Sequence, residues 1–336
     1  MQKVLNKQII LEKRPVGKIA DGDLRFDEQE VQDIPEGSAL IENLYVSIDP
    51  THRIWMSSMR QYMDPIKLGA VIRALGVGKV KASKDPKLSE GAIVTGELGW
   101  QTHAIRKASE VFPVPFEPKP ISSLLSVYGL TGVTAYFGLL DIGQPKAGET
   151  VLVSGAAGAV GSVVGQIAKI KGCRVVGVCG SDEKCDWIVN ELGFDAAIQY
   201  KRQNLSEAIK ETCPQGIDVY FENVGGDVLE SSLLQMNQFS RLVLCGLISN
   251  YNLTKAPEGV KNFAQILMQR IKVQGFIASD YLPRWPEAIA QLSSWVQEGK
   301  IKYKEDIVDG LSQIPSAVNK LFEGTNSGKL MAKVSE

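Results

Sequence analysis

The sequence predicts an α/β protein of two domains, with a doubly wound, mostly parallel sheet in one domain and a β-rich fold in the other. Three observations point to this class. The chain has 336 residues, more than the ~250–300 residues at which single hydrophobic cores stop growing. Residues 1–125 have strand-like composition punctuated by glycine. After them, short apolar runs alternate with helical patterns, as in parallel sheets that are covered by helices.

The first part of the chain contains several candidate strands. Residues 39–48, 70–80 and 92–96 have the apolar and β-branched composition that is typical of strands. Residues 111–120 contain four prolines, which prevent a helix there. We interpret this stretch as an extended linker and a candidate domain boundary.

The alternation of strands and helices begins at the apolar run 150–154. The residues after it have helical spacing, with apolar side chains at i, i+3, i+4, i+7 and i+8: Val160, Val163, Val164, Ile167 and Ala168. Further strands are predicted at 174–179, 197–200, 218–221, 241–245 and 273–277. Further helices are predicted at 183–192, 205–212, 228–234, 260–269 and 286–297.

Composition and charge exclude several classes of protein. The chain is 44% hydrophobic and 22% charged, which is typical of a globular protein and unlike a disordered one. The 37 Lys and Arg residues balance 38 Asp and Glu residues, so no broad basic surface for nucleic acid or an anionic membrane is expected. Residues 120–140 and 150–168 lack charge, but both are rich in Gly, Ser and Thr. We therefore do not interpret them as membrane spans.

Cysteine usage and the N-terminus predict a cytoplasmic protein. The five cysteines are odd in number and form no C-x-x-C pair, which favours reduced thiols. The first seven residues lack a long apolar core, so no signal peptide is expected.

A glycine-rich turn follows the strand at 150–154. Gly155, Gly158 and Gly161 are spaced so that backbone amides can approach a pyrophosphate at a helix N-terminus. A turn of this kind can also be purely structural. Its place between a strand and a helix, with another strand to follow, favours dinucleotide binding in a Rossmann domain.

The end of the second strand, around Cys179 and Gly180, indicates which dinucleotide binds. NAD-binding proteins usually carry a carboxylate at this strand tip, and this chain has none. Ser181 can donate a hydrogen bond and Lys184 can pair with a 2′-phosphate, so we predict NADP(H). Alternatively, Ser181 is a helix N-cap followed by first-turn acids and a solvated lysine.

The sequence lacks the residue patterns that several other classes of enzyme require. No cysteine occurs before residue 173 and the two histidines are His52 and His103, so no zinc site is expected. Every Gly-Lys pair is followed by Ile, Val or Leu, which excludes a Walker A loop. Nothing points to a Ser-His-Asp hydrolase.

Several motifs between residues 49 and 329 resemble one family. They are Asp49-Pro50, 129–136 (GLTGVTAY), 156–161 (AAGAVG), 180–184 (GSDEK), 221–226 (FENVGG), 245–252 (CGLISNYN), 274–277 (QGFI) and 326–329 (NSGK). The chain resembles the zinc-independent medium-chain dehydrogenase/reductases, in the branch of prostaglandin, alkenal double-bond and bacterial curcumin reductases. The resemblance implies a GroES-like domain from residues 1–125 and 305–336 around a Rossmann domain at 126–304. It also implies a homodimer.

The resemblance also assigns cofactor-binding residues. Gly158, Ala159, Val160 and Gly161 would hold the pyrophosphate. Residues assigned to the 2′-phosphate corner are Ser181, Lys184 and Tyr200. Residues assigned to the nicotinamide side are Asn223, Cys245, Gly246, Ser249, Tyr251, Phe276, Ile277, Ala278 and, from the other domain, Asn326.

The implied reaction reduces the carbon–carbon double bond of an α,β-unsaturated ketone or aldehyde with NADPH. Tyr251 would sit beside the substrate carbonyl and stabilise the enolate. Asp49, Thr51 and His52 are the expected substrate-binding residues. The family commonly has Asp-Pro-Tyr-Met-Arg where this chain has Asp-Pro-Thr-His-Arg, so the pocket is expected to differ. A quinone reductase and a non-catalytic NADPH-binding protein remain as alternatives.

Overall fold

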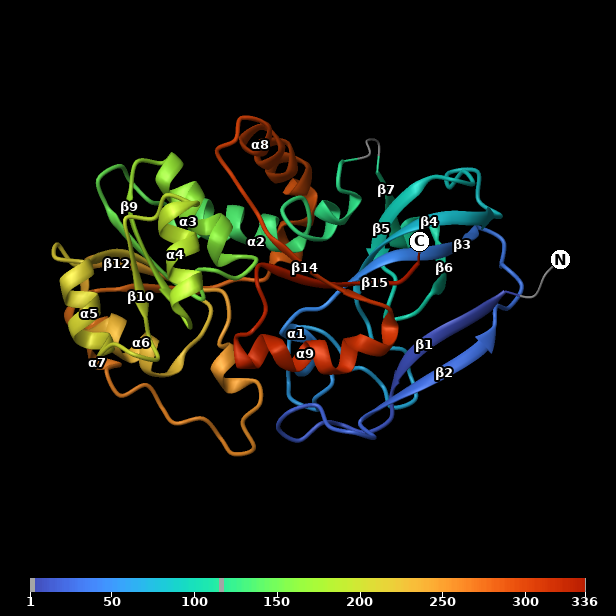
Figure 1. Cartoon of the computed structure of the whole chain (residues 1–336), viewed down its shortest axis with the longest axis horizontal. Coiled ribbons are helices and arrows are strands. Elements are labelled where there is room, and N and C mark those ends of the chain that lie inside the picture. The colour runs from blue at the N-terminus through green and yellow to red at the C-terminus, as the bar shows by residue number, and fades with distance from the viewer. Residues whose placement is uncertain (1–3, 115–117, 336) are drawn as a thin grey trace. The chain divides into compact units, whose positions relative to one another are not determined.

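The computed structural model describes residues 4–114 and 118–335. Pro115, which belongs to the proline-rich linker of the sequence analysis, lies outside them. The chain forms two compact units (Figure 1). One comprises Met1–Leu125, Glu305–Asn326 and Leu330–Glu336; we call it the β-rich unit. The other comprises Ser126–Lys304 and Ser327–Lys329; we call it the nucleotide unit.

The β-rich unit is built on two sheets. An antiparallel pair joins β1 (Leu5–Leu11) to β2 (Leu24–Glu30). A seven-stranded sheet has the order β14-β15-β3-β4-β5-β7, with β6 paired to β3. Its strands are β3 (Ser38–Ser47), β4 (Leu75–Ser83), β5 (Ile93–Glu97), β6 (His103–Lys107), β7 (Val111–Pro113), β14 (Glu305–Asp309) and β15 (Lys329–Lys333).

Two helices complete this unit, α1 (Thr51–Trp55) and α9 (Ile314–Glu323). The three-residue and five-residue turns η1 (Ala108–Glu110), η2 (Ile121–Leu125) and η6 (Leu311–Gln313) are 3-10 helical. The apolar face of α9 packs into a core that includes Ile9, Leu11 and Trp100, all of them fully buried. The C-terminal segment therefore shares one core with the N-terminal strands.

The nucleotide unit contains a six-stranded sheet in which every neighbouring pair is parallel. The strand order is β10-β9-β8-β11-β12-β13, the order of a doubly wound sheet that binds dinucleotides. Its strands are β8 (Thr150–Ser154), β9 (Arg174–Cys179), β10 (Ala196–Gln199), β11 (Ile217–Glu222), β12 (Met236–Leu244) and β13 (Lys272–Gly275). The order reverses between β8 and β11, and ligands bind at the carboxyl ends of strands beside such a switch point.

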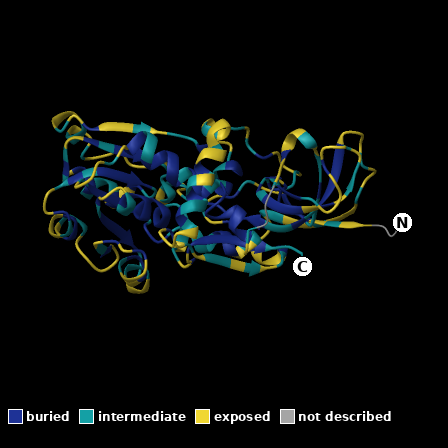
Figure 2. Cartoon of the chain, turned by 90° about the horizontal axis from the view of Figure 1, so that it is seen from above, coloured by how far each residue is buried: buried dark blue, intermediate teal, exposed yellow. Residues whose placement is uncertain are grey.

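Helices pack on this sheet. The α-helices are α2 (Leu130–Phe137), α3 (Gly161–Ile170), α4 (Asp182–Asn190), α5 (Leu205–Thr212), α6 (Gly226–Leu233), α7 (Ala264–Met268) and α8 (Trp285–Gln297). They are joined by a π-helical segment, η3 (Gly138–Gly143), and two 3-10 segments, η4 (Ile248–Asn250) and η5 (Ala278–Arg284). All five residues of β8 are buried, as expected for a central parallel strand (Figure 2).

Two predicted elements are shorter than expected. The strand predicted over 70–80 begins at Leu75, because the backbone of Ala70 and Ile72 bonds to β1 instead. The helix predicted over 260–269 is confined to α7, because the N–H groups of Lys261 and Asn262 bind the Glu230 carboxylate in a turn. Both differences come from partners that are distant in the sequence.

The uncharged stretch at 120–140 contains α2, which the sequence analysis did not predict as a helix. Six of its eight residues are buried, and it contacts α3 and α8. A helix that is buried on most sides lacks the one-sided apolar pattern by which helices are recognised. Among the residues described, no helix combines the length and apolar character needed to cross a membrane.

Candidate cofactor and substrate site

The glycine turn joins β8 to α3 at the carboxyl edge of the sheet. Gly155 has a φ of +59°, a conformation that side chains rarely adopt. A Cβ on Gly161 would lie 2.4 Å from the Gly155 carbonyl oxygen, and a Cβ on Gly158 would lie 3.1 Å from it. Val160, the N-cap residue of α3, contributes no side-chain cap. The turn therefore exposes backbone rather than side chains at a helix N-terminus, which fits a pyrophosphate.

Ala159 and Val160 are half-buried within this turn, between the two glycines. Gly158 also forms a parallel bridge with Gly328, which follows Asn326 by two residues. Asn326 is a buried residue of the β-rich unit. The motif at 326–329 thus begins in one unit and contributes its glycine to the other.

The predicted 2′-phosphate corner lies at the end of β9. Ser181 is the N-cap of α4 and accepts a bond from the Lys184 N–H, so its alternative role as a helix cap is present. Tyr200 lies directly beside this tip: a Cβ on Gly180 would be 3.2 Å from the Tyr200 ring, and the Tyr200 N–H donates to Cys179. The structure thus brings Ser181, Lys184 and Tyr200 to adjoining strand ends.

Two cations here were not found from the sequence. The Asp182 carboxylate, which would oppose a phosphate, forms an ion pair with Arg202. Lys201 reaches toward the same tip, with its Cε 3.6 Å from a Cβ placed on Gly180. The feature of the sequence that could have revealed these cations is the Lys-Arg pair directly after Tyr200, at the end of β10. Arg202 thus pairs with Asp182, one of the two acids in the first turn of α4.

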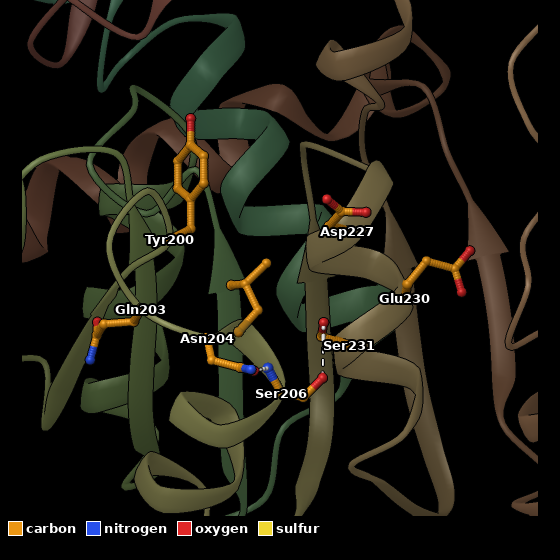
Figure 3. A pocket seen from close by; sticks show the side chains of 8 residues that line it. Tyr200, Gln203, Asn204, Ser206, Asp227, Glu230 and Ser231 are labelled. Carbon is orange, nitrogen blue, oxygen red and sulfur yellow. Dashed lines mark hydrogen bonds between the residues drawn. The ribbon is translucent and has the colours of Figure 1, made fainter.

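A polar pocket extends from Tyr200 between the first turns of α5 and α6. Figure 3 shows Tyr200 and Gln203 on one side of it and Asp227, Glu230 and Ser231 on the other. Its lining residues are Tyr200, Gln203, Asn204, Leu205, Ser206, Asp227, Glu230 and Ser231. Asn204 caps α5 by accepting the N–H groups of Ser206 and Glu207. The pocket is therefore walled by helix N-termini at the carboxyl edge of the sheet.

The residues predicted for the nicotinamide side meet at the ends of β8, β11 and β12. Asn223 donates its backbone N–H to the Ser154 hydroxyl at 2.8 Å and its side-chain amide to the Ser154 carbonyl at 2.7 Å. Cys245 and Gly246 both donate N–H groups to the Glu222 carbonyl. Ser249 donates its N–H to Val224 at 3.0 Å. Two loops thus run side by side at the switch point.

Glu222 is a buried carboxylate that the sequence analysis missed. Its side chain is 0% exposed and accepts bonds from the Ser154 hydroxyl at 2.6 Å, the Tyr220 hydroxyl at 2.5 Å and the Val224 N–H at 2.5 Å. Burial raises the pKa of Glu222, and these donors act in the opposite direction. The available signal was an acid at the end of a largely apolar strand, which also carries Asp218 near its start.

Tyr251 follows the 3-10 turn η4 and folds back over its own loop. Its hydroxyl oxygen accepts the Leu247 N–H at 3.2 Å and lies 3.2 Å from a Cβ placed on Gly246. The oxygen acts as the acceptor in this bond, so the bond does not use the phenolic proton. The phenol therefore lies within the group formed by Asn223, Cys245 and Gly246.

The segment at 276–278 is arranged differently from these loops. The Phe276 ring packs edge-on against Phe221 and Tyr281, with centroids 6.5 and 6.4 Å apart. Ile277 is the N-cap residue of η5, and Ala278 is buried. The Phe276 ring thus packs against two aromatic rings, and the predicted cofactor contacts of this segment stay a prediction.

Asp49, Thr51 and His52 lie at and before the start of α1 in the β-rich unit. The Asp49 carboxylate accepts a bond from the Ser47 hydroxyl, and its backbone N–H bonds to the His52 Nδ1. The His52 ring is 0% exposed and packs against Trp55 and Trp100, at centroid distances of 5.2 and 4.6 Å. His52 is therefore a core side chain here, contrary to the expected substrate contact, because two indole rings cover it. Thr51 is half-buried.

No group of three or more His, Cys, Asp or Glu side chains that could hold a metal ion occurs in the described parts of the chain. The five cysteines are free.

Comparisons with known proteins agree with this architecture. Residues 7–114 match the family described as the N-terminal domain of oxidoreductase, and residues 159–294 match the zinc-binding dehydrogenase family. The NADPH-dependent curcumin reductase of Escherichia coli is 41% identical over 99% of this chain and 98% of its own. The NADP⁺-dependent 2-alkenal reductase of Nicotiana tabacum is 40% identical over 99% of both chains.

A solved structure is also similar, that of CurA from Vibrio vulnificus in complex with NADPH. It superimposes with a TM-score of 0.94 at 41% identity, over 98% of this chain and 99% of that one. The fold and the site define an NADP-dependent oxidoreductase with a Rossmann domain. The chain belongs to the zinc-independent medium-chain dehydrogenase/reductases, in the branch that contains the curcumin, 2-alkenal and prostaglandin reductases.

Proposed function

We propose that this protein reduces the carbon–carbon double bond of α,β-unsaturated ketones or aldehydes with NADPH. The observation that carries the proposal is the placement of the Tyr251 hydroxyl. The Leu247 N–H holds it above Gly246, in the group that includes Asn223 and Cys245. The names of two relatives, a curcumin reductase and a 2-alkenal reductase, support the substrate class.

When bound, NADPH supplies the hydride that is added to the β-carbon of the substrate. Negative charge then develops on the carbonyl oxygen, and a hydrogen-bond donor aimed at that oxygen stabilises the transition state more than the ground state. We assign this donor role to Tyr251. The backbone N–H of Leu247 donates to the phenol oxygen and helps to fix the position of the hydroxyl group. The α-carbon takes its proton from solvent or through Tyr251.

The cofactor would be held along the carboxyl edge of the nucleotide unit. The glycine turn at 155–161 would receive the pyrophosphate. Ser181, Lys184 and Tyr200 would bind the 2′-phosphate, with Lys201 adding positive charge. Asn223, Cys245, Gly246 and Ser249 would surround the nicotinamide, with the 276–278 backbone and Asn326 beyond them. Asp49 and Thr51 remain the proposed substrate contacts from the β-rich unit, with His52 supporting them from the core.

The Tyr251→Phe substitution tests the mechanism. We expect kcat/KM for an enone to fall by roughly 10–1,000-fold, the scale of losing one oxyanion donor, while the Kd for NADPH changes less than about twofold. Tyr45→Phe, on β3 of the other unit, is the matched control and should leave both values unchanged. A Tyr251→Phe enzyme within twofold of the parent rate would remove Tyr251 from the mechanism.

A substrate panel tests the reaction itself. It contains a diarylheptanoid enone, a keto-prostaglandin-like enone, a short alkenal and a quinone, each with NADPH and with NADH. The expected result is NADPH-dependent formation of the saturated carbonyl compound. Turnover of the quinone alone would establish the quinone reductase alternative. Tight NADPH binding without turnover of any compound would favour a non-catalytic NADPH-binding protein.

We further propose a cytoplasmic homodimer. The five free cysteines support a reducing compartment. In and next to α7, the side chains of Phe263, Leu267 and Met268 are 65%, 73% and 59% exposed, which favours an association surface there. Light scattering coupled to size-exclusion chromatography should give twice the 36.6 kDa chain mass. A monomer at assay concentrations would contradict the dimer.

A further inference from the structure

Glu222 stands out as a fully buried acid whose partners carry no charge. It ends β11, whose neighbours in the sheet are β8 and β12. Its carboxylate accepts from two hydroxyl groups and a backbone N–H, those of Ser154, Tyr220 and Val224. Burying a carboxylate costs free energy that hydrogen bonds to neutral donors only partly offset. An apolar residue would suit this strand end better if packing were its only role.

The contacts of Glu222 connect the ends of three adjacent strands. The Ser154 hydroxyl at the end of β8 donates to the carboxylate and accepts the Asn223 N–H. The Glu222 carbonyl accepts the N–H groups of Cys245 and Gly246, which follow β12. The carboxylate also binds the Val224 N–H in the turn before α6. The side chain of Glu222 therefore holds the turn at 223–224, and its backbone carbonyl holds the segment at 245–246.

The geometry of this network limits which side chains can replace Glu222. The Ser154 hydroxyl and the Val224 N–H donate to one carboxylate oxygen, and the Tyr220 hydroxyl donates to the other. A glutamine can keep its oxygen on Ser154 and Val224, because the Tyr220 hydroxyl can accept a bond from its NH₂ group. A leucine would leave the Val224 N–H and the two hydroxyl groups without their acceptor. Loss of this acceptor would release the turn that carries Asn223.

We propose that Glu222 is a positioning residue for the nicotinamide half of NADPH. It does not touch the cofactor itself. Its carboxylate acts through Val224 and, by way of the Ser154 hydroxyl, through Asn223, whose backbone it holds in the receiving arrangement. The inference rests on the cofactor placement of the proposed function, and not on the identity of the substrate.

The test compares two ligands that share the adenosine end. NADPH carries the nicotinamide, and 2′,5′-ADP carries the adenosine and 2′-phosphate without it. For Glu222→Leu we expect the Kd for NADPH to rise at least tenfold and the Kd for 2′,5′-ADP to stay within twofold. Glu222→Gln, which can keep the hydrogen bonds, should lie closer to the parent protein. Isothermal titration calorimetry measures both affinities. Glu211→Leu, at an exposed acid on α5, is the matched control and should change neither.

The outcomes separate positioning from folding. Equal weakening of both ligands, or no weakening of either, would overturn the proposal. If Glu222→Leu fails to fold, Ser154→Ala removes the link between the carboxylate and Asn223 and should show the same selective loss. Equal weakening of both ligands in that variant would again overturn it. Binding is measured without an enone, so failure of the substrate assignment would leave this result unaffected.

Discussion

The two ends of the proposed cofactor site are built in opposite ways. At the 2′-phosphate end, the side chains stand on strand tips near solvent: Tyr200 is 40% exposed, and Arg202 and Asp182 pair at the surface. At the nicotinamide end, the Glu222 carboxylate, which is 0% exposed, accepts the Val224 N–H, and the Glu222 backbone carbonyl accepts the N–H groups of the 245–246 loop. The proposed 2′-phosphate end would therefore select its ligand through charged side chains near the surface. The nicotinamide end depends on buried hydrogen bonds that fix backbone positions.

The two ends of the proposed site also differ in the pKa of a cysteine thiol. Cys185 lies in the first turns of α4, beside Lys184, and its pKa is lowered mainly because the Cys179 thiol donates a hydrogen bond to it. Cys245 lies in the loop after β12, where burial raises the pKa of its thiol to about 12. Both thiol side chains are partly buried. The comparison teaches that the surroundings favour the thiolate at the adenosine end and the neutral thiol at the nicotinamide end.

The largest effect is expected at the turn that joins the two ends. In Gly161→Ala, the added Cβ would lie 2.4 Å from the Gly155 carbonyl oxygen, so the turn must move. A displacement of this size should weaken NADPH binding on the order of 100-fold. Because the pyrophosphate serves both halves, the affinity for 2′,5′-ADP should also fall. Calorimetric titration measures both affinities.

The control for this change is Gly259→Ala, because a Cβ there would meet no atom within 4 Å and the position has no positive φ. It should leave binding and the unfolding temperature unchanged. Normal NADPH affinity in Gly161→Ala would show that the turn does not contact the cofactor.

The next effect is confined to the 2′-phosphate end. Removing the ammonium group in Lys184→Ala should raise the KM for NADPH by roughly 10–100-fold, the scale of a lost hydrogen bond to a charged group. The KM for NADH should hardly change, since NADH lacks the phosphate. Lys184→Arg, which keeps the charge, should lie closer to the parent enzyme. Equal effects on both cofactors would refute the phosphate contact.

The smallest effect is expected in the reaction rates of the two thiols, Cys185 at one end and Cys245 at the other. Cys185 should react with iodoacetamide at least ~10-fold faster than Cys245 at pH 8, because the thiolate is the nucleophile and the raised pKa of Cys245 keeps that thiol protonated. The lowered pKa of Cys185 shifts its reaction toward lower pH than that of an ordinary thiol. Peptide mass spectrometry follows both sites. In Cys179→Ala, which lacks the donor, the pH dependence of Cys185 should return to ordinary values.

Much of the nucleotide unit could be predicted from local patterns. The strands at 150–154 and 174–179 and the helix at 205–212 have the predicted bounds. Each is a short apolar run or an amphipathic stretch bounded by glycine or a capping residue, so its signal lies within its own residues. The helix α2 escaped prediction because it is buried on most sides. The roles of Tyr251 and Asn223 came from the resemblance to a family, since a loop tyrosine and a turn asparagine carry no specific local signal.

The sequence by itself determined the alternation of strands and helices, the glycine turn after β8 and the missing carboxylate at the tip of β9. The tertiary structure decided which distant groups meet. It paired Asp182 with Arg202, enclosed His52 between two tryptophans and brought Ser154 to Glu222 across 68 residues. The physical reason is the range of the interactions. Backbone conformation and helix caps depend on neighbouring residues, whereas the partner of a buried carboxylate depends on the order of the strands in the sheet.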